Sequence, residues 1–216
     1  MKNLLFIGSN DMDNPPGELN NYITEYKNGL FIEPVPDAFV RLQKVLNDSN
    51  IKNNTNYIGI NELITDKSGE DYKFYIYQQN ACANNQFDMK YTEVSSSLFN
   101  QNTINSKKLW GGGAPIQTNE FVNLKSKTIT EVLKENNWDN KKYDCVIDTQ
   151  GSELLVLKGF SHLNNIEKLT IECSTIEIYK GGVLFDELHN YLISKNFKLI
   201  KAPSSHHCDI IYVNSQ

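Results

Sequence analysis

Residues 144–160 read DCVIDTQGSELLVLKGF, and this stretch decides the fold. A short apolar run ends at Asp148, a polar turn with one glycine follows, and an amphipathic helix pattern then stops at Gly159. Strand, turn and helix in this order form half of a crossover between parallel strands. Open α/β sheets bind ligands outside the carboxyl ends of such strands, so Asp148 and Glu153 are the first candidate functional residues.

The same alternation of elements extends over most of the chain. Strand patterns occur at 4–8, 29–34, 55–64, 143–148, 166–174, 198–203 and 208–214. Helix patterns occur at 17–29, 36–48, 128–137, 152–160 and 185–197. The pattern at 62–78 predicts additional β structure with a turn. Residues 80–127 show little pattern and include a glycine-rich loop at 106–120. The last two strands are too close for a parallel crossover and must form an antiparallel hairpin.

These elements predict an α/β, Rossmann-like fold. It has a mostly parallel seven-stranded sheet that ends in a C-terminal antiparallel hairpin, with helices on both faces. This outline resembles the class I methyltransferase fold. The length of 216 residues suits a single domain over 1–216.

Composition excludes several classes of protein. The net charge of −5 argues against nucleic acid as the main partner. No run approaches the roughly 18 apolar residues that span a bilayer, and the first residues turn acidic too soon for a signal peptide. The cysteines lack a CxxC pair, and those at 145 and 173 lie in apolar strand patterns, which favours small buried side chains over disulfides or zinc ligands; the positions are Cys82, Cys145, Cys173 and Cys208. We therefore expect a reducing, cytoplasmic location.

Polar residues follow the predicted strands at the edge where a ligand is expected. They are Gly8, Ser9, Asn10, Glu33, Asn61, Glu62, Asp148 and Glu172. Gly8 lets a ligand approach the backbone, and Glu33 has the chemistry to accept both hydroxyls of an adenosine ribose. Taken singly, Glu33 is equally consistent with a solvated carboxylate, and Gly-Ser-Asn with a simple turn.

Several blocks, in order, resemble the FkbM-type methyltransferases that use S-adenosylmethionine. The resemblance covers about 31–214, and its most specific parts are FIEPVP at 31–36 and DTQGSELLVLKG at 148–159. Weaker blocks are NELITDKSGE, SSSLF, KTITEVL and LTIECSTIEIYKGG. The resemblance implies an O-methyltransferase that acts on a hydroxyl of a sugar, a glycan or a glycosylated small molecule.

The resemblance also implies roles for individual residues. Glu33 would bind the ribose, and Gly8, Ser9 and Asn10 the methionine part of the cofactor. Asn61 and its neighbours, with Ser96, would border the adenine. Asp148 would lie beneath the sulfonium and the acceptor, and Glu172 and Glu153 would be further carboxylates at the acceptor end. Glu153 is equally suited to a capping role at the start of a helix.

The first motif departs from the family pattern of acid-x-Gly-small-Asn-x-Gly. Phe6 replaces the acid and Met12 the second glycine, so the backbone path must differ, and Asp11 or Asp13 is left to supply the charge. The first strand also begins almost at the first residue. We expect either a domain of a parent polypeptide, or an acceptor site that is open or completed by a partner such as a second copy in a homodimer.

Methyl transfer to a hydroxyl requires in-line alignment and a base that removes the proton. The candidate catalytic residues are Asp148, Glu172 and His207; His207 and His206 alternatively belong to an exposed polar loop. Asp148, Glu172 and Asp209 offer oxygen ligands for Mg²⁺ or Mn²⁺, but no ligand spacing requires a metal. Trp110 is either a stacking surface for a sugar or a packed anchor.

Two other classes of function stay open at this point. The altered first motif is consistent with a degenerate, non-catalytic cofactor-fold module that binds without turnover. A dehydrogenase is disfavoured by the lack of GxGxxG after the first strand and by the terminal hairpin.

Overall fold

The computed structural model describes residues 2–13, 15–78, 95–111, 114 and 116–215. One of the cysteines, Cys82, lies outside these ranges. Within them, no helix is long and apolar enough to cross a membrane.

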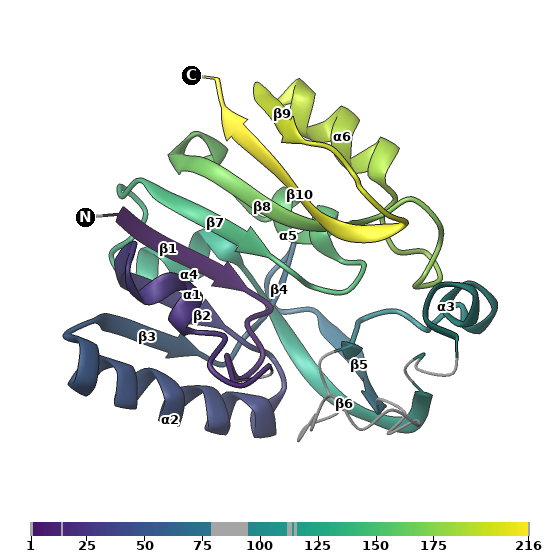
Figure 1. The fold of residues 1–216 in the computed structure, drawn as a ribbon, viewed down its shortest axis with the longest axis horizontal. Coiled ribbons are helices and arrows are strands. Elements are labelled where there is room, and N and C mark those ends of the chain that lie inside the picture. The colour runs from purple at the N-terminus through teal and green to yellow at the C-terminus, as the bar shows by residue number, and fades with distance from the viewer. Residues whose placement is uncertain (1, 14, 79–94, 112–113, 115, 216) are drawn as a thin grey trace.

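The main sheet has seven strands in the order β3-β2-β1-β7-β8-β10-β9 (Figure 1). Their bounds are β1 Lys2–Ile7, β2 Tyr26–Ile32, β3 Asn56–Ile60, β7 Tyr143–Ile147, β8 Ile166–Ser174, β9 Phe197–Lys201 and β10 His207–Asn214. Pairing is parallel from β3 through β8 and antiparallel for β10 with both of its neighbours. The predicted sheet with its C-terminal hairpin is confirmed.

Helices cover both faces of this sheet because strand side chains alternate between the faces. Leu5 and Ile7 of β1 face the larger core, to which α4 (Ile129–Glu135), α5 (Glu153–Lys158) and α6 (Phe185–Ser194) contribute. Leu4 and Phe6 face the opposite core beneath α2 (Pro36–Asn53). The predicted placement of helices on both faces is therefore confirmed.

A second sheet and another helix lie beyond the edge at which β1, β2 and β7 end (Figure 1). This sheet has the order β4-β6-β5, with β4 Leu63–Thr65, β5 Asp71–Gln78 and β6 Ile116–Thr128. The helix is α3 (Thr103–Trp110), and a short 3-10 turn, η3, covers Leu163–Asn165. The expected strand at 55–64 is thus divided between two sheets, and the loop expected at 106–120 contains the end of α3 and the start of β6.

The helix predicted over 17–29 is wrong in extent. Only α1 (Asn20–Ile23) is helical, and β2 begins at Tyr26. The helical spacing misleads because Leu19 and Tyr26 are buried in the same core, one from a turn and the other from a strand. Tyr26 is fixed there by donating a hydrogen bond to Asp144 Oδ2 at 2.8 Å.

Candidate functional site

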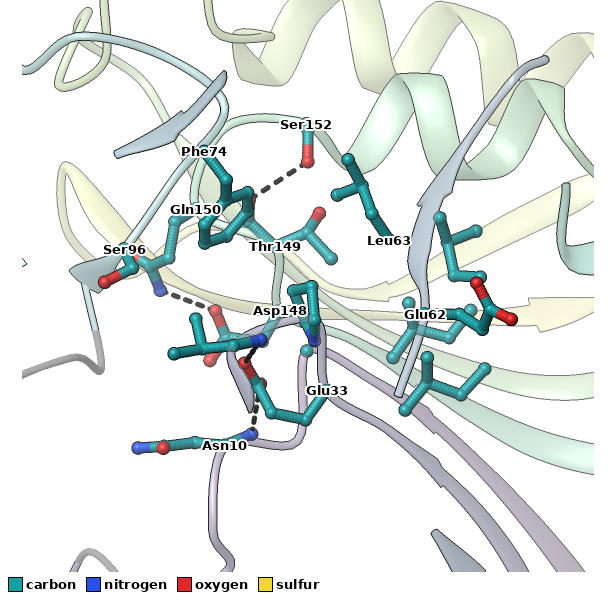
Figure 2. A pocket seen from close by; sticks show the side chains of 16 residues that line it. Asn10, Glu33, Glu62, Leu63, Phe74, Ser96, Asp148, Thr149, Gln150 and Ser152 are labelled. Atoms are coloured by element: carbon teal, nitrogen blue, oxygen red, sulfur yellow. Dashed lines mark hydrogen bonds between the residues drawn. The ribbon is translucent and has the colours of Figure 1, made fainter. Parts of the chain in front are cut away.

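A pocket opens at the carboxyl ends of β1, β2 and β7, with about 510 Å³ of empty space that includes its opening to solvent. The second sheet closes its other side through Leu63 and Phe74 (Figure 2). Its lining comprises Ile7, Gly8, Asn10, Ile32, Glu33, Pro34, Val35, Glu62, Leu63, Ile64, Phe74, Ser96, Asp148, Thr149, Gln150 and Ser152. The pocket lies where the strand-end argument placed it.

Glu33 follows β2 and is held firmly at the pocket wall. It is 6% exposed, and one carboxylate oxygen accepts a hydrogen bond from the backbone N–H of Asn10 at 2.9 Å (Figure 2). The other accepts the backbone N–H of Val35 at 2.8 Å. A carboxylate oxygen can accept more than one hydrogen bond. The arrangement therefore suits a fixed acceptor for ligand hydroxyls.

The turn after β1 supplies the wall next to Glu33. Gly8 has a φ of +81°, and a Cβ on it would lie 1.8 Å from the backbone oxygen of Asp148. Glycine is thus required here because the turns after β1 and β7 touch, whether or not a ligand also contacts Gly8. Asn10 lines the pocket, and its Nδ2 is buried without a hydrogen-bond partner in the structure. A buried donor of this kind suits an acceptor oxygen of a ligand.

Ser9 and Asn61 lie outside the pocket lining. Ser9 is 2% exposed, and its hydroxyl donates to the backbone oxygen of Ile32 at 3.3 Å. Asn61 is exposed, and its Nδ2 donates to the backbone oxygen of Glu33 at 2.8 Å. Ser96 does line the pocket, and its hydroxyl accepts from the backbone N–H of Tyr77 at 3.2 Å.

The unusual first motif has a structural explanation. Phe6 and Met12 are both buried in the core beneath α2, and Met12 adopts a left-handed φ of +56°. Met12 thus takes a conformation for which glycine is usually needed, with its side chain fully buried. The Asp11 carboxylate pairs with Arg41 Nε at 2.9 Å and also accepts the backbone N–H of Asp13.

Glu153 holds the turn that carries Asp148. It is 2% exposed, and its Oε1 accepts the backbone N–H groups of Thr149 (3.1 Å) and Gly151 (3.0 Å). The turn includes Gln150 at a φ of +54°, an uncommon conformation for a side chain of this type. These hydrogen bonds fix the turn that precedes α5, whose N-cap residue is Ser152.

Asp148 belongs to a series of neighbouring polar side chains, here named the polar chain: Tyr179, Gln150, Asp148, Glu172, His207 and Ser174. Tyr179 donates to Gln150 Oε1, and Gln150 Nε2 donates to Asp148 Oδ1, both at 2.6 Å. Asp148 lies close enough to Glu172 for the charge of Glu172 to raise its pKa. Glu172 Oε1 lies 2.9 Å from His207 Nε2, whose ring Nδ1 lies 2.8 Å from Ser174 Oγ.

The structure thus brings together Asp148, Glu172 and His207, the three predicted catalytic residues. Sequence reasoning gave no role to Tyr179, Gln150 and Ser174, although all three lie in the quoted blocks, because only the fold shows which side chains they contact.

Carboxyl groups dominate the electrostatics of the polar chain. Burial, Glu172 and Glu153 raise the pKa of Asp148 well above its usual value. Burial and Glu153 raise the pKa of Glu172 to about 8. Two carboxyl groups in contact share a proton when neither ionises easily. Burial lowers the pKa of His207 and outweighs the neighbouring carboxylates, which raise it. The lowered pKa favours the neutral ring.

Glu18 is a further carboxyl group near this site that the sequence did not indicate. It precedes α1, and burial and the charge of Asp148 raise its pKa to about 7, with Asp11 and Asp209 adding to the effect. Asp209 itself lies opposite Glu172 in the β8–β10 register and is exposed.

No metal site is formed by the described residues. Within 2–13, 15–78, 95–111, 114 and 116–215, no group of three His, Cys, Asp or Glu side chains is arranged to hold a metal ion. The suggested set of Asp148, Glu172 and Asp209 is therefore not supported.

Trp110 and His206 flank the polar chain. Trp110 is the last residue of α3, and its ring meets that of His207 edge-on, with 5.2 Å between ring centroids. The expectation that Trp110 lies in a glycine-rich loop is wrong, because the helix includes it. His206 is exposed and lies 2.7 Å from Thr175 Oγ1 through its Nδ1.

A family model described as the methyltransferase FkbM domain matches residues 7–199, which is most of the sequence. The chain belongs to the FkbM methyltransferase family. The resemblance seen in the sequence motifs is thereby confirmed. Among curated proteins, none matches this FkbM chain.

A solved structure supports the fold of this FkbM chain. The crystal structure of methyltransferase FkbM from Methylobacillus flagellatus KT aligns with a TM-score of 0.53 and 15% sequence identity. The alignment covers 98% of this chain and 43% of that one, so the chain spans less than half the length of that protein. At this identity the likeness shows the fold.

Proposed function

We propose that the pocket binds S-adenosylmethionine and that the chain transfers its methyl group to a hydroxyl of a sugar, a glycan or a glycosylated small molecule. The observation that carries the proposal is the pairing of Glu33 with Asn10 at the ends of β2 and β1. Glu33 presents fixed carboxylate oxygens. Asn10 presents a buried Nδ2 without a hydrogen-bond partner among the described residues. Acceptors for ribose hydroxyls and a donor for a carboxylate are what this cofactor requires.

The residues present fit the cofactor along the whole pocket. Glu33 would hold the ribose, Asn10 the methionine carboxylate, and Ser96, Leu63 and Phe74 the adenine. Asp148 and the polar chain begin where these contacts end. When bound, S-adenosylmethionine supplies a methyl group made electrophilic by its positive sulfonium.

The polar chain supplies the group that takes the acceptor proton. Asp148 is the member of the Asp148–Glu172 pair that lines the pocket, so we assign it the contact with the acceptor hydroxyl. The proton of that hydroxyl passes to the pair once the shared proton has been lost. A positioned base of this kind contributes about 10²–10⁴-fold to a rate.

Glu172 and His207 act through Asp148 as positioning residues. His207 Nε2 lies 2.9 Å from Glu172 Oε1, and its neutral ring can accept a proton from the carboxyl pair. Gln150 and Tyr179 fix the other side of Asp148. Trp110, beside His207, presents an aromatic ring near the acceptor end, which suits a sugar face.

The first experiment is calorimetric titration with S-adenosylmethionine and S-adenosylhomocysteine, with NAD as the control. Micromolar binding of the first two and none of NAD is expected. Glu33→Ala should weaken binding at least tenfold, whereas Asp148→Ala should abolish turnover with a smaller loss of affinity. An equal loss of affinity in the two variants contradicts this division of roles.

Turnover is then screened with glycan and glycoside acceptors by mass spectrometry of the methylated product. Cofactor binding without methyl transfer to any acceptor would favour the alternative of a non-catalytic binding module. The cytoplasmic location stays a prediction, as does the treatment of 1–216 as one domain.

A further inference from the structure

Two cysteines occupy directly opposite positions on the antiparallel strands β8 and β10. Cys173 pairs with Cys208 in the register of these strands, and the flanking pairs are Glu172 with Asp209 and Ser174 with His207. Side chains alternate along a strand, so both thiols lie on the face opposite to that of Glu172 and His207. Both cysteines are free in the structure.

The backbone geometry of this pair suits a disulfide. Opposite residues of antiparallel strands have Cα atoms about 4.5 or 5.5 Å apart. Disulfides span Cα separations of about 4.4–6.8 Å, so either distance is suitable. Both side chains point to the same face of the sheet, because directly opposite residues of paired strands do so. A bond between them therefore requires little movement of the strands.

The two thiols differ in a way that gives the pair an attacking and a resolving member. Cys208 is partly exposed, and its thiol donates to the backbone oxygen of Ser205 at 3.6 Å. Burial works against ionisation of Cys208, but hydrogen bonds from Ser205 and Ser204 outweigh it and lower the pKa of this thiol. Cys173 is 3% exposed, and burial and the neighbouring Cys208 raise its pKa to about 12.

We propose that Cys173 and Cys208 are a redox modification site that forms a reversible disulfide by exchange with a small-molecule disulfide such as oxidised glutathione. The Cys208 thiolate attacks one glutathione sulfur, the glutathione S–S bond breaks, and one glutathione leaves as a thiolate that takes a proton from solvent. Cys173 then loses its proton to solvent and attacks Cys208 Sγ, and the second glutathione leaves and is protonated. Two protein thiols are oxidised, and one glutathione disulfide is reduced to two thiols.

The bond would join the two strands that carry Glu172 and His207. It closes a loop from 173 to 208, which restricts the unfolded chain and stabilises the folded one. For a chain of this length, we expect the unfolding temperature to rise by about 5–10 °C on oxidation. The proposal is independent of the methyl-transfer chemistry, because it concerns the opposite face of the sheet.

The test uses the full chain with Cys82→Ser, because Cys82 lies outside the described residues and would add a thiol. This leaves three of the four cysteines of the sequence, one of which, Cys145, is 1% exposed on β7. The protein is incubated with oxidised glutathione, its free thiols are counted after denaturation, and the peptides are mapped by mass spectrometry. The expected result is the loss of two thiols, a Cys173–Cys208 peptide, and the higher unfolding temperature, all reversed by dithiothreitol.

A matched variant that also carries Cys208→Ser should lose no thiol and gain no stability. The proposal is overturned if the thiols of the parent protein persist, if glutathione stays attached to Cys208 without resolution, or if the bond links two chains. It is also overturned if the disulfide forms without a rise in unfolding temperature.

Discussion

At the scale of single residues, the contact between Asp148 and Glu172 is the most unusual feature of the site. Two buried, neighbouring carboxyl groups hold a proton at a pH at which free carboxylates are ionised, because burial and like charge disfavour the ionised forms. The pKa of Glu172, raised to about 8 by burial and by Glu153, means that the folded protein carries this proton at neutral pH. An unfolded glutamate releases its proton near pH ~4.3.

The shared proton predicts a pH-dependent stability that Glu172→Gln should reduce. Between about pH 4.5 and pH 8 the folded state binds more protons than the unfolded state, so stability falls as pH rises through this window. Glutamine cannot ionise, so this source of pH dependence is lost in the variant. We expect the drop in unfolding temperature from pH 5 to pH 8.5 to be smaller in Glu172→Gln by about 2–5 °C.

The measurement is calorimetric or fluorescence-detected unfolding at a series of pH values, with Glu167→Gln as the control. Glu167 is an exposed glutamate on the same strand, and its profile should follow that of the parent protein. If the unfolding temperatures of Glu172→Gln and the parent protein changed equally with pH, Glu172 would be ionised over the whole pH range tested, and the prediction would be wrong.

At the scale of elements, the site depends on two turns in contact, one after β1 and one after β7. Gly8 allows that contact, because its φ is +81° and its missing Cβ leaves room for the backbone oxygen of Asp148. Gly69 has nearly the same φ, +84°, but nothing lies within 4 Å of the position of its Cβ. Alanine at Gly69 therefore measures the free-energy cost of the left-handed conformation alone. Alanine at Gly8 adds the cost of the steric clash with Asp148.

Gly69→Ala should lose about 1–2 kcal/mol of unfolding free energy, the cost of a left-handed alanine. Gly8→Ala should lose at least about 1–3 kcal/mol more, because the turn that carries Asp148 must move. Its affinity for S-adenosylhomocysteine should also fall, whereas that of Gly69→Ala should not change. Urea unfolding and calorimetric titration check both statements, and equal losses in the two variants would exclude the collision as the cause.

Element by element, the sequence predicts best where the pattern is local. The β7–turn–α5 unit around Asp148 follows from the apolar run, one glycine and the amphipathic spacing, and the structure has each part. The spacing of Leu19 and Tyr26 fails because a shared core, and not a helix, accounts for it. Helix α3 is missed although Asn102 is a recognisable N-cap, because Ser106 is its buried residue and the helix has no apolar stripe.

The residues of the candidate site are likewise predicted best where the sequence pattern is local. Strand ends place Glu33, Asn10 and Asp148 at the pocket, since the rule for parallel sheets needs only the order of elements. Tyr179 comes from a loop after β8, and its contact with Gln150 depends on packing between distant segments. Such partners carry no local pattern.

At the scale of the whole molecule, the pocket is built by two sheets and not by one. The main sheet supplies the polar wall with Glu33 and Asp148, and the β4-β6-β5 sheet supplies Leu63 and Phe74 (Figure 2). Phe74 is 6% exposed and packs with Val35 and Leu63. A ligand in the pocket therefore contacts both sheets and should stabilise the molecule by binding only their assembled form.

This arrangement predicts that the apolar wall contributes to affinity independently of Glu33. Phe74→Leu keeps most of the side-chain volume but removes the flat ring, and we expect about 3–10-fold weaker binding of S-adenosylhomocysteine. Phe121→Leu on β6 is the matched control, because Phe121 is 43% exposed and lies outside the pocket lining. Its affinity should equal that of the parent protein in calorimetric titration. If Phe74→Leu also binds as tightly as the parent, the second sheet encloses the pocket without holding the ligand, and the polar wall of the main sheet carries the binding energy.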